Sequence, residues 1–177
     1  MLVGYDPSTL DAEVAVMQPA WPRCRGSVPR MHFTEFDTRL AAYGLLISDD
    51  DQMLLTWFNG GGRAEPGWTM PGGGVEFDES INAAVAREVF EETGYTVDVG
   101  DIVAEHHFTL PRQGARRPLR SQRFLLTATI TGGELGTTET DGTTDFAAWV
   151  PLHEVAELRP RADIIEVALD VLRQRSH

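Results

Sequence analysis

Apolar positions gather along the chain in short runs, which glycine-rich or acidic segments separate. Two of these runs, 40–48 and 53–58, flank Asp49, Asp50 and Asp51 and predict a β-hairpin. A glycine-rich loop over 59–67 follows the second run. Further strands are predicted over 96–99, 102–109, 123–131 and 146–150, and an amphipathic pattern predicts a closing helix over 163–174. Strands interspersed with helices indicate an α/β fold with helices packed on the faces of a sheet.

A helix over 78–93 has the clearest boundaries in the sequence. Asp78 is its predicted N-cap, and Gly94 stands at the C′ position that glycine favours. On a helical wheel the apolar side is continuous, and it is made of Ile81, Ala83, Val85, Ala86, Val89 and Phe90. More than half of the helix surface is therefore expected to be buried.

Three carboxylates, those of Glu88, Glu91 and Glu92, share the last turns of this helix, and Glu92 falls on its apolar side. Like charges three or four residues apart cost about a few tenths of a kcal/mol each, and the helix dipole also disfavours negative charge there. The arrangement is explained if a divalent cation supplies the missing counter-charge, because Mg²⁺ takes carboxylate oxygens and commonly bridges to phosphate. Arg87 lies one turn before Glu91 and could orient that carboxylate. The alternative is a solvated acidic helix face.

Gly72, Gly73 and Gly74 immediately precede the helix. Without side chains, they let the backbone pass close to a ligand and present peptide N–H and C=O groups at the start of the helix. We therefore count all three as candidate substrate-binding residues. A plain tight turn is the alternative.

The segment 73–95 contains Gly73, then Glu79 after five residues, and then, after seven more residues, the run Arg87-Glu88-Val89-Phe90-Glu91-Glu92-Thr93-Gly94-Tyr95. This segment resembles the Nudix box, the signature of the MutT-like Nudix hydrolases. Tyr95 departs from the aliphatic residue that is usual there, which concerns packing rather than metal binding. The likeness continues weakly through Trp68-Thr69-Met70-Pro71 and Trp149-Val150-Pro151-Leu152. It implies a Nudix hydrolase domain over 31–177, folded as an α/β/α sandwich with a mixed β-sheet. Residues 1–30 are expected to form an irregular extension.

The resemblance implies a metal-dependent enzyme that attacks phosphorus with water and cleaves a nucleoside diphosphate linked to another moiety. Glu88, Glu91 and Glu92, with the carbonyl of Gly73, would hold Mg²⁺, which Mn²⁺ can replace. Glu79 and Arg87 would hold the geometry of the loop and the helix, and Glu88 or Glu92 would act as the general base. A distant loop supplies the base in some relatives, and the acidic candidates for that role here are Glu134, Glu139, Asp141 and Asp145.

Five of the 15 arginines fall within 112–123, in a chain of net charge −12. Guanidinium groups bind phosphate bidentately, so we expect one or two of the five, with Arg112 and Arg123 as candidates, to contact the substrate. A solvent-exposed basic loop is the alternative. His106 and His107 face opposite sides of a strand, and packing is the favoured role for both. Four aromatic residues could stack a base or belong to the core: Tyr43, Trp57, Phe58 and Phe108.

The composition of the 177 residues narrows the function further. With 42% hydrophobic and 24% charged residues the chain is an ordinary globular one, and 27 acidic against 15 basic residues argue against a nucleic-acid polymer as partner. All basic residues are arginine, which excludes P-loop and Schiff-base chemistry. The one cysteine, Cys24, excludes an intrachain disulfide. No apolar run is long enough for a membrane span, so we expect a cytoplasmic protein.

Other readings of the sequence stay open. One is a catalytically silent Nudix-like module that senses nucleotides, although such modules often lose box carboxylates that this chain retains. Another is the isomerase chemistry of related folds, which uses a reactive cysteine. Pro111, 16 residues after Tyr95, favours ADP-ribose only slightly over (deoxy)nucleoside triphosphates. A short helix is predicted over 10–17. The leader as a whole is disordered, or a partner-binding arm, or an overlong start with translation beginning at Met31, and the sequence does not choose between them. A homodimer is an open alternative to a monomer.

Overall fold

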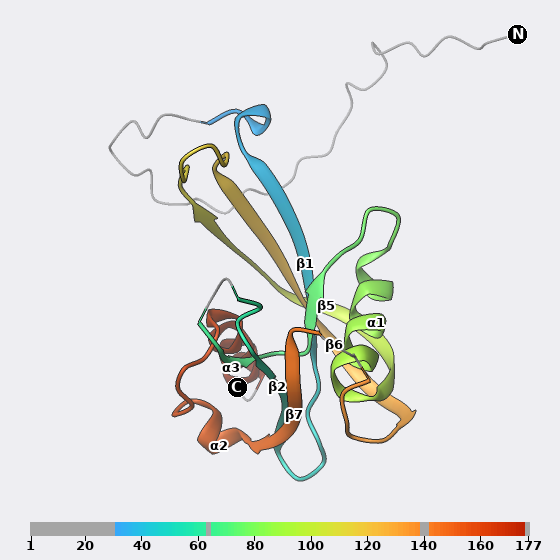
Figure 1. The fold of residues 1–177 in the computed structure, drawn as a ribbon. Helices are drawn as coiled ribbons and strands as arrows, with labels where there is room; N and C mark the ends of the chain where they lie inside the picture. The colour runs from blue at the N-terminus through green and yellow to red at the C-terminus, as the bar shows by residue number, and fades with distance from the viewer. Residues whose placement is uncertain (1–30, 63–64, 139–141, 176–177) are drawn as a thin grey trace, which may run out of the picture. The chain divides into compact units, whose positions relative to one another are not determined.

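The computed structural model describes residues 31–62, 65–138 and 142–175 (Figure 1). The predicted leader, its helix over 10–17, Glu139 and Asp141 lie outside the described residues.

A four-stranded sheet forms the centre of the fold. It contains β1 (Asp37–Leu45), β4 (Gly72–Gly74), β5 (Tyr95–Leu110) and β6 (Leu119–Gly133), in the order β4-β1-β6-β5. Strand β1 is parallel to β6 and antiparallel to β4, and β5 is antiparallel to β6, so the sheet is mixed as expected. The two strands predicted over 96–99 and 102–109 are one continuous strand, β5, whose register shifts between Val99 and Ile102. A bulge of this kind bends a strand without ending it.

A second, antiparallel sheet contains β2 (Gln52–Phe58), β3 (Gly67–Thr69) and β7 (Thr144–Pro151), in the order β3-β2-β7. The predicted hairpin of 40–48 with 53–58 is therefore wrong, because β1 and β2 belong to different sheets. Only an isolated bridge between Ile47 and Met53 remains of it. Residues 41–46 and 53–56 are buried throughout, and a strand that is buried on both faces does not reveal its pairing partner through its hydrophobic pattern.

Helix α1 (Ile81–Thr93) packs on one face of the four-stranded sheet, and α3 (Asp163–Arg175) packs on the other. The sheet has a hydrophobic core on each face, and strand β1 contributes to both. Ala41 packs with the residues of α3, and Ala42 packs with Val85 and Val89 of α1. Figure 1 shows the strands between α1 and α3. The predicted α/β/α sandwich is confirmed. The short helices η2 (Phe33–Glu35) and α2 (Leu152–Val155) were not predicted.

Helix α1 begins at Ile81 rather than at Asp78, and its N-cap is Ser80. The Ser80 hydroxyl accepts a hydrogen bond of 3.1 Å from the Ala83 N–H. A turn precedes the cap, because the Glu79 carboxylate accepts a 3.1 Å bond from the Glu76 N–H. This turn includes Asp78, the predicted N-cap. The helix therefore starts after the turn, and its N-cap is Ser80, two residues later.

The C-terminal end of α1 follows the prediction. Gly94 has a φ of 75° and its N–H donates to the carbonyl of Phe90, as expected of a left-handed C-cap. The Phe90 side chain itself is 45% exposed, so its predicted burial is wrong. The apolar side of α1 is narrower than the wheel suggested, and Glu92 rather than Phe90 is buried. The closing helix was predicted over 163–174 and is confirmed as α3. No helix within the described ranges combines the length and the apolar character needed to cross a bilayer.

Candidate active site

Arg87 connects the start of α1, its last turns and strand β4. Its Nε and Nη2 donate two bonds of 2.9 Å to the carboxylate of Glu79, and Nη2 also donates to the Gly74 carbonyl at 3.1 Å. Its Nη1 reaches Glu88 at 3.0 Å and Glu91 at 3.1 Å. The hydrogen bond to Glu79 is the main reason why the pKa of Arg87 is raised, and the same bond lowers the pKa of Glu79. Arg87 and Glu79 thus form a fixed ion pair that organises this region.

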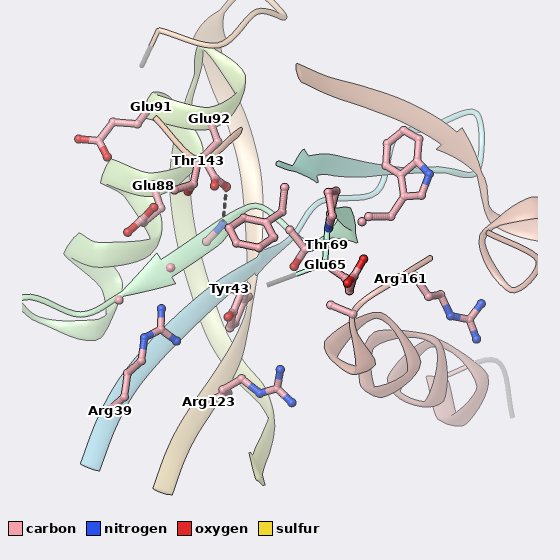
Figure 2. Close-up of a pocket in the computed structure, with 18 of the residues that line it drawn as sticks. Arg39, Tyr43, Glu65, Thr69, Glu88, Glu91, Glu92, Arg123, Thr143 and Arg161 are labelled. Atoms are coloured by element: carbon pink, nitrogen blue, oxygen red, sulfur yellow. Dashed lines mark hydrogen bonds between the residues drawn. The ribbon is translucent and has the colours of Figure 1, made fainter. Parts of the chain in front are cut away.

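Glu92 is buried, with only 6% of its surface exposed. One carboxylate oxygen accepts a 2.9 Å bond from the Gly72 N–H (Figure 2), and the other accepts a 2.6 Å bond from the Thr144 hydroxyl. A buried carboxylate requires such donors. Glu92 is therefore held between β4 of one sheet and β7 of the other.

The glycine run is strand β4, neither a loop nor a plain tight turn. A Cβ atom added to Gly73 would lie 2.5 Å from Oε1 of Glu88, and one added to Gly72 would overlap the carbonyl of Ala42. Gly72 also has a φ of 144°, a backbone conformation that L-residues rarely adopt. The missing side chains thus allow α1 to place a carboxylate directly against the strand.

One cavity of about 820 Å³ brings most of the predicted site together (Figure 2). Arg87, the carboxylates of Glu88, Glu91 and Glu92 and the three glycines of β4 line one side of it. Glu79 does not line the cavity, but it forms an ion pair of 2.9 Å with Arg87, which does. Among the described residues, no group of three or more acidic, histidine or cysteine side chains is gathered as a metal site. Instead, Arg87 binds Glu88 and Glu91, while Glu92 binds to β4 and β7.

The arginines of the predicted basic segment have different surroundings. Arg123 lines the cavity, whereas Arg112 is exposed and does not. Arg117 forms an ion pair of 2.9 Å with Asp37, and Arg120 donates to Gln122 at 3.0 Å. Arg116 is exposed and does not line the cavity either. For the arginines other than Arg123, the structure agrees with a basic surface segment.

The two histidines do not line the cavity. His106 Nδ1 lies 2.7 Å from Nη2 of Arg123, while His107 is exposed. Of the four aromatic candidates, Tyr43, Phe58 and Phe108 line the cavity. Trp57 does not line it and packs edge-on against Trp68, with ring centroids 5.4 Å apart.

The acidic residues predicted to precede the last strand contribute no carboxylate to the cavity among those described, and Asp145 lies within β7 itself. Glu134 and Asp145 do not line it, and Asp145 accepts a 3.0 Å bond from Asn59 instead. Pro111 is also absent from the cavity wall. Residues that sequence reasoning missed do line the cavity or hold the site: Arg39, Glu65, Thr143, Thr144 and Arg161. They stand singly in the sequence, and no motif marked them.

The match to known proteins agrees with this geometry. The family model described as NUDIX domain matches residues 37–169, which is more than half of the chain and includes the whole segment from Gly73 to Tyr95. The chain belongs to the Nudix family. Nudix hydrolases act on pyrophosphate bonds and generally use a divalent metal.

Three relatives illustrate the range of the match. The Nudix chain is 30% identical over 108 residues to diphosphoinositol polyphosphate phosphohydrolase 3-beta of Bos taurus. The aligned segment covers 60% of this chain and 61% of that protein. The fold resembles a NUDIX hydrolase from Nitrosomonas europaea, with a TM-score of 0.65, 21% identity and coverage of 78% of this chain and 90% of that chain. It also resembles the NUDIX domain of NrtR from Shewanella oneidensis, solved with ADP ribose, with a TM-score of 0.56, 19% identity and coverage of 80% and 89%. The matched segments span between 28% and 61% of the length of the curated relatives.

Proposed function

We propose that this Nudix chain is a pyrophosphohydrolase that uses Mg²⁺, replaceable by Mn²⁺, to cleave a nucleoside diphosphate linked to another moiety. The observation that supports this most is the arrangement around Arg87. One guanidinium ties Glu79, β4 and two helix carboxylates together at the wall of a cavity. The arrangement stabilises the fold, and it also holds two carboxylates at fixed positions beside the cavity, which a site for a phosphate-bound cation needs.

In the proposed reaction, a water oxygen forms a bond to one phosphorus atom and the bridging P–O bond breaks. The leaving phosphate keeps the electron pair of that bond, and the water gives up a proton to a base. A bound divalent cation would neutralise the phosphate oxygens and make the attacking water more acidic. The chain itself must hold the two phosphates in line and accept the proton.

The residues at the cavity wall fit such a cation. Glu88, Glu91 and Glu92 offer the hard oxygen donors that Mg²⁺ prefers, and the carbonyl of Gly73 is the proposed fourth donor. Because Gly73 has no Cβ atom, the carboxylate of Glu88 can lie directly against its backbone. Arg87 Nη1 and a cation would compete for the same carboxylates. Its Nε and Nη2 bonds to Glu79 and Gly74 would keep the guanidinium in place in either case.

Glu88 or Glu92 remains our candidate for the general base. Both line the cavity, whereas Glu134 and Asp145 do not, which argues against these two as the distant-loop alternative. The proposal also includes a nucleotide-derived substrate rather than a nucleic-acid polymer. The proposal also includes a cytoplasmic location, and a homodimer stays open.

The test is hydrolysis of a panel of nucleotides, with separate reactions in Mg²⁺ and Mn²⁺. Wild type is expected to release phosphate-bearing products from at least one of them. Glu92→Gln should lose activity by roughly 100-fold or more, because it removes a donor and a candidate base together. Glu134→Gln makes the same chemical change outside the cavity and should keep wild-type activity. A wild-type protein that binds nucleotides but cleaves none would instead support the nucleotide-sensing alternative.

A further inference from the structure

Arg123 is a buried cation with an unused hydrogen-bond donor. Its side chain is 5% exposed, and Nη2 contacts Asp163 and His106, both at 2.7 Å. Its guanidinium carbon lies 4.8 Å from the centre of the Phe108 ring. Its Nε is buried and has no hydrogen-bond partner among the described residues. A buried guanidinium N–H without an acceptor is costly, and Asp163 is 59% exposed and thus screened by solvent.

Arg39 stands beside Arg123 on the neighbouring strand. It is in register with Ser121, which precedes Arg123 by two residues on the same face of β6. No described residue forms an ion pair or hydrogen bond with the side chain of Arg39, and the buried hydroxyl of Ser121 is also without a partner in the described part of the chain. Figure 2 shows Arg39 and Arg123 on adjacent strands, across β4 from the carboxylates of α1.

The other two described arginines of the cavity wall, Arg87 and Arg161, already bind protein groups. Arg87 binds Glu79, Glu88 and Glu91. Arg161 binds Glu166 at 2.5 Å and the carbonyls of Val155 and Ala156. Among the four described arginines that line the cavity, Arg39 therefore keeps its whole guanidinium group for a ligand, and Arg123 keeps its Nε.

We infer that Arg39 and Arg123 form a subsite for the terminal phosphoryl group of the substrate. A terminal phosphoryl group carries up to two negative charges on three oxygens and so matches two guanidinium groups. A phosphate esterified on both sides carries a single charge and offers fewer oxygens. This inference rests on the proposed function, because it places the terminal group in the cavity where the cleaved bond would lie. The preferred substrates are then polyphosphates with an uncapped end, such as nucleoside triphosphates, rather than doubly capped diphosphates such as ADP-ribose.

The test is isothermal titration calorimetry of inorganic tripolyphosphate and of ADP-ribose, at low ionic strength and with a chelator present. The chelator removes metal and turnover, so the result does not depend on hydrolysis. Wild type should bind tripolyphosphate, and Arg39→Gln and Arg123→Gln should each weaken this binding by roughly tenfold or more, the loss expected for a charge-assisted hydrogen bond. ADP-ribose binding should change much less in both variants. Arg39 is exposed and makes no ion pair within the described ranges, so its variant remains informative if Arg123→Gln fails to fold.

Asp163→Asn is the matched control, because it breaks the ion pair of Arg123 but leaves the guanidinium. If Arg123 served only to attach α3, this variant would weaken tripolyphosphate binding as Arg123→Gln does, and the inference would be overturned. Unchanged or tighter binding supports the subsite. No binding by wild type, wild-type affinity in Arg39→Gln, or equal losses for tripolyphosphate and ADP-ribose would each overturn it. Tripolyphosphate binding through Arg39 without hydrolysis of any nucleotide would leave the subsite standing and refute the proposed function.

Discussion

The Thr144 hydroxyl donates a 2.6 Å hydrogen bond to the buried carboxylate of Glu92. Thr144 begins β7 in one sheet, whereas Glu92 lies on the helix that covers the other sheet. Thr144→Val keeps the shape of the side chain but removes the donor. We expect a loss of about 1–3 kcal/mol in the free energy of unfolding, since a buried carboxylate oxygen loses its partner. Urea denaturation measures this loss. Thr129→Val, at an exposed position of β6, should change stability little, and equal effects of the two variants would contradict the prediction.

Arg87→Lys preserves the charge and removes the planar fork. A lysine ammonium cannot make the paired bonds to Glu79 and still reach the Gly74 carbonyl. We expect the free energy of unfolding to fall by about 1–3 kcal/mol and nucleotide hydrolysis to fall with it. Arg173→Lys is the matched control, because Arg173 makes only exposed pairs on α3, which contribute about 0–1 kcal/mol. An Arg87→Lys variant as stable and as active as wild type would refute the role given to the fork.

Gly73→Ala tests the close approach of Glu88 to β4. The added methyl group would lie 2.5 Å from the carboxylate of Glu88, so either the strand or the side chain must move. The expected destabilisation is about 1–3 kcal/mol, together with weaker binding of the divalent cation in calorimetry. An alanine at Gly136 meets no atom within 4 Å and should change neither measurement. Unaltered cation binding by Gly73→Ala would argue against Gly73 and Glu88 as joint parts of a metal site.

Burial, followed by the positive charge of Arg123, lowers the pKa of His106. Because the unfolded chain then takes up a proton at a higher pH than the folded chain, the contribution of His106 to stability is complete above about pH 6.5. It is lost as the pH falls from there through the lowered pKa of the folded state. Melting temperatures of wild type should therefore fall more between pH 7.5 and 5.5 than those of His106→Asn, which cannot titrate. His107→Asn, at an exposed position, should behave as wild type. Parallel curves for wild type and His106→Asn would refute the assignment.

The residues that could be predicted from sequence are those whose relationship is local. Glu88, Glu91 and Glu92 share one helix, so their spacing alone placed them near one another, and the helical wheel placed Glu92 on the apolar side, where the structure buries it. The start of α1 could not be predicted from the local sequence alone. Asp78 and Ser80 are both good N-caps, and only the contact of Glu79 with the Glu76 N–H decides between them.

The rest of the site depends on tertiary structure. Arg39, Thr144 and Arg161 come from strands and a loop far apart in sequence, and each is an ordinary residue in its own segment. The division of β1 and β2 between two sheets was hidden for a related reason, since both strands are apolar on both faces. Arg112 and Arg123 looked equivalent by composition, but only Arg123 faces inward from a strand, and Arg112 follows the end of β5.

The anchoring of Arg87 to a strand carbonyl and to helix carboxylates has a mechanical consequence. Because Arg87 binds both β4 and α1, a small shift of the helix along the sheet should also move the residues of the cavity wall. Val85 and Val89 lie on the buried face of α1 and are fully buried. Their size sets the distance between that helix and the sheet. The rate of the proposed hydrolysis should therefore fall when Val85 or Val89 is shortened, although neither side chain can contact a substrate.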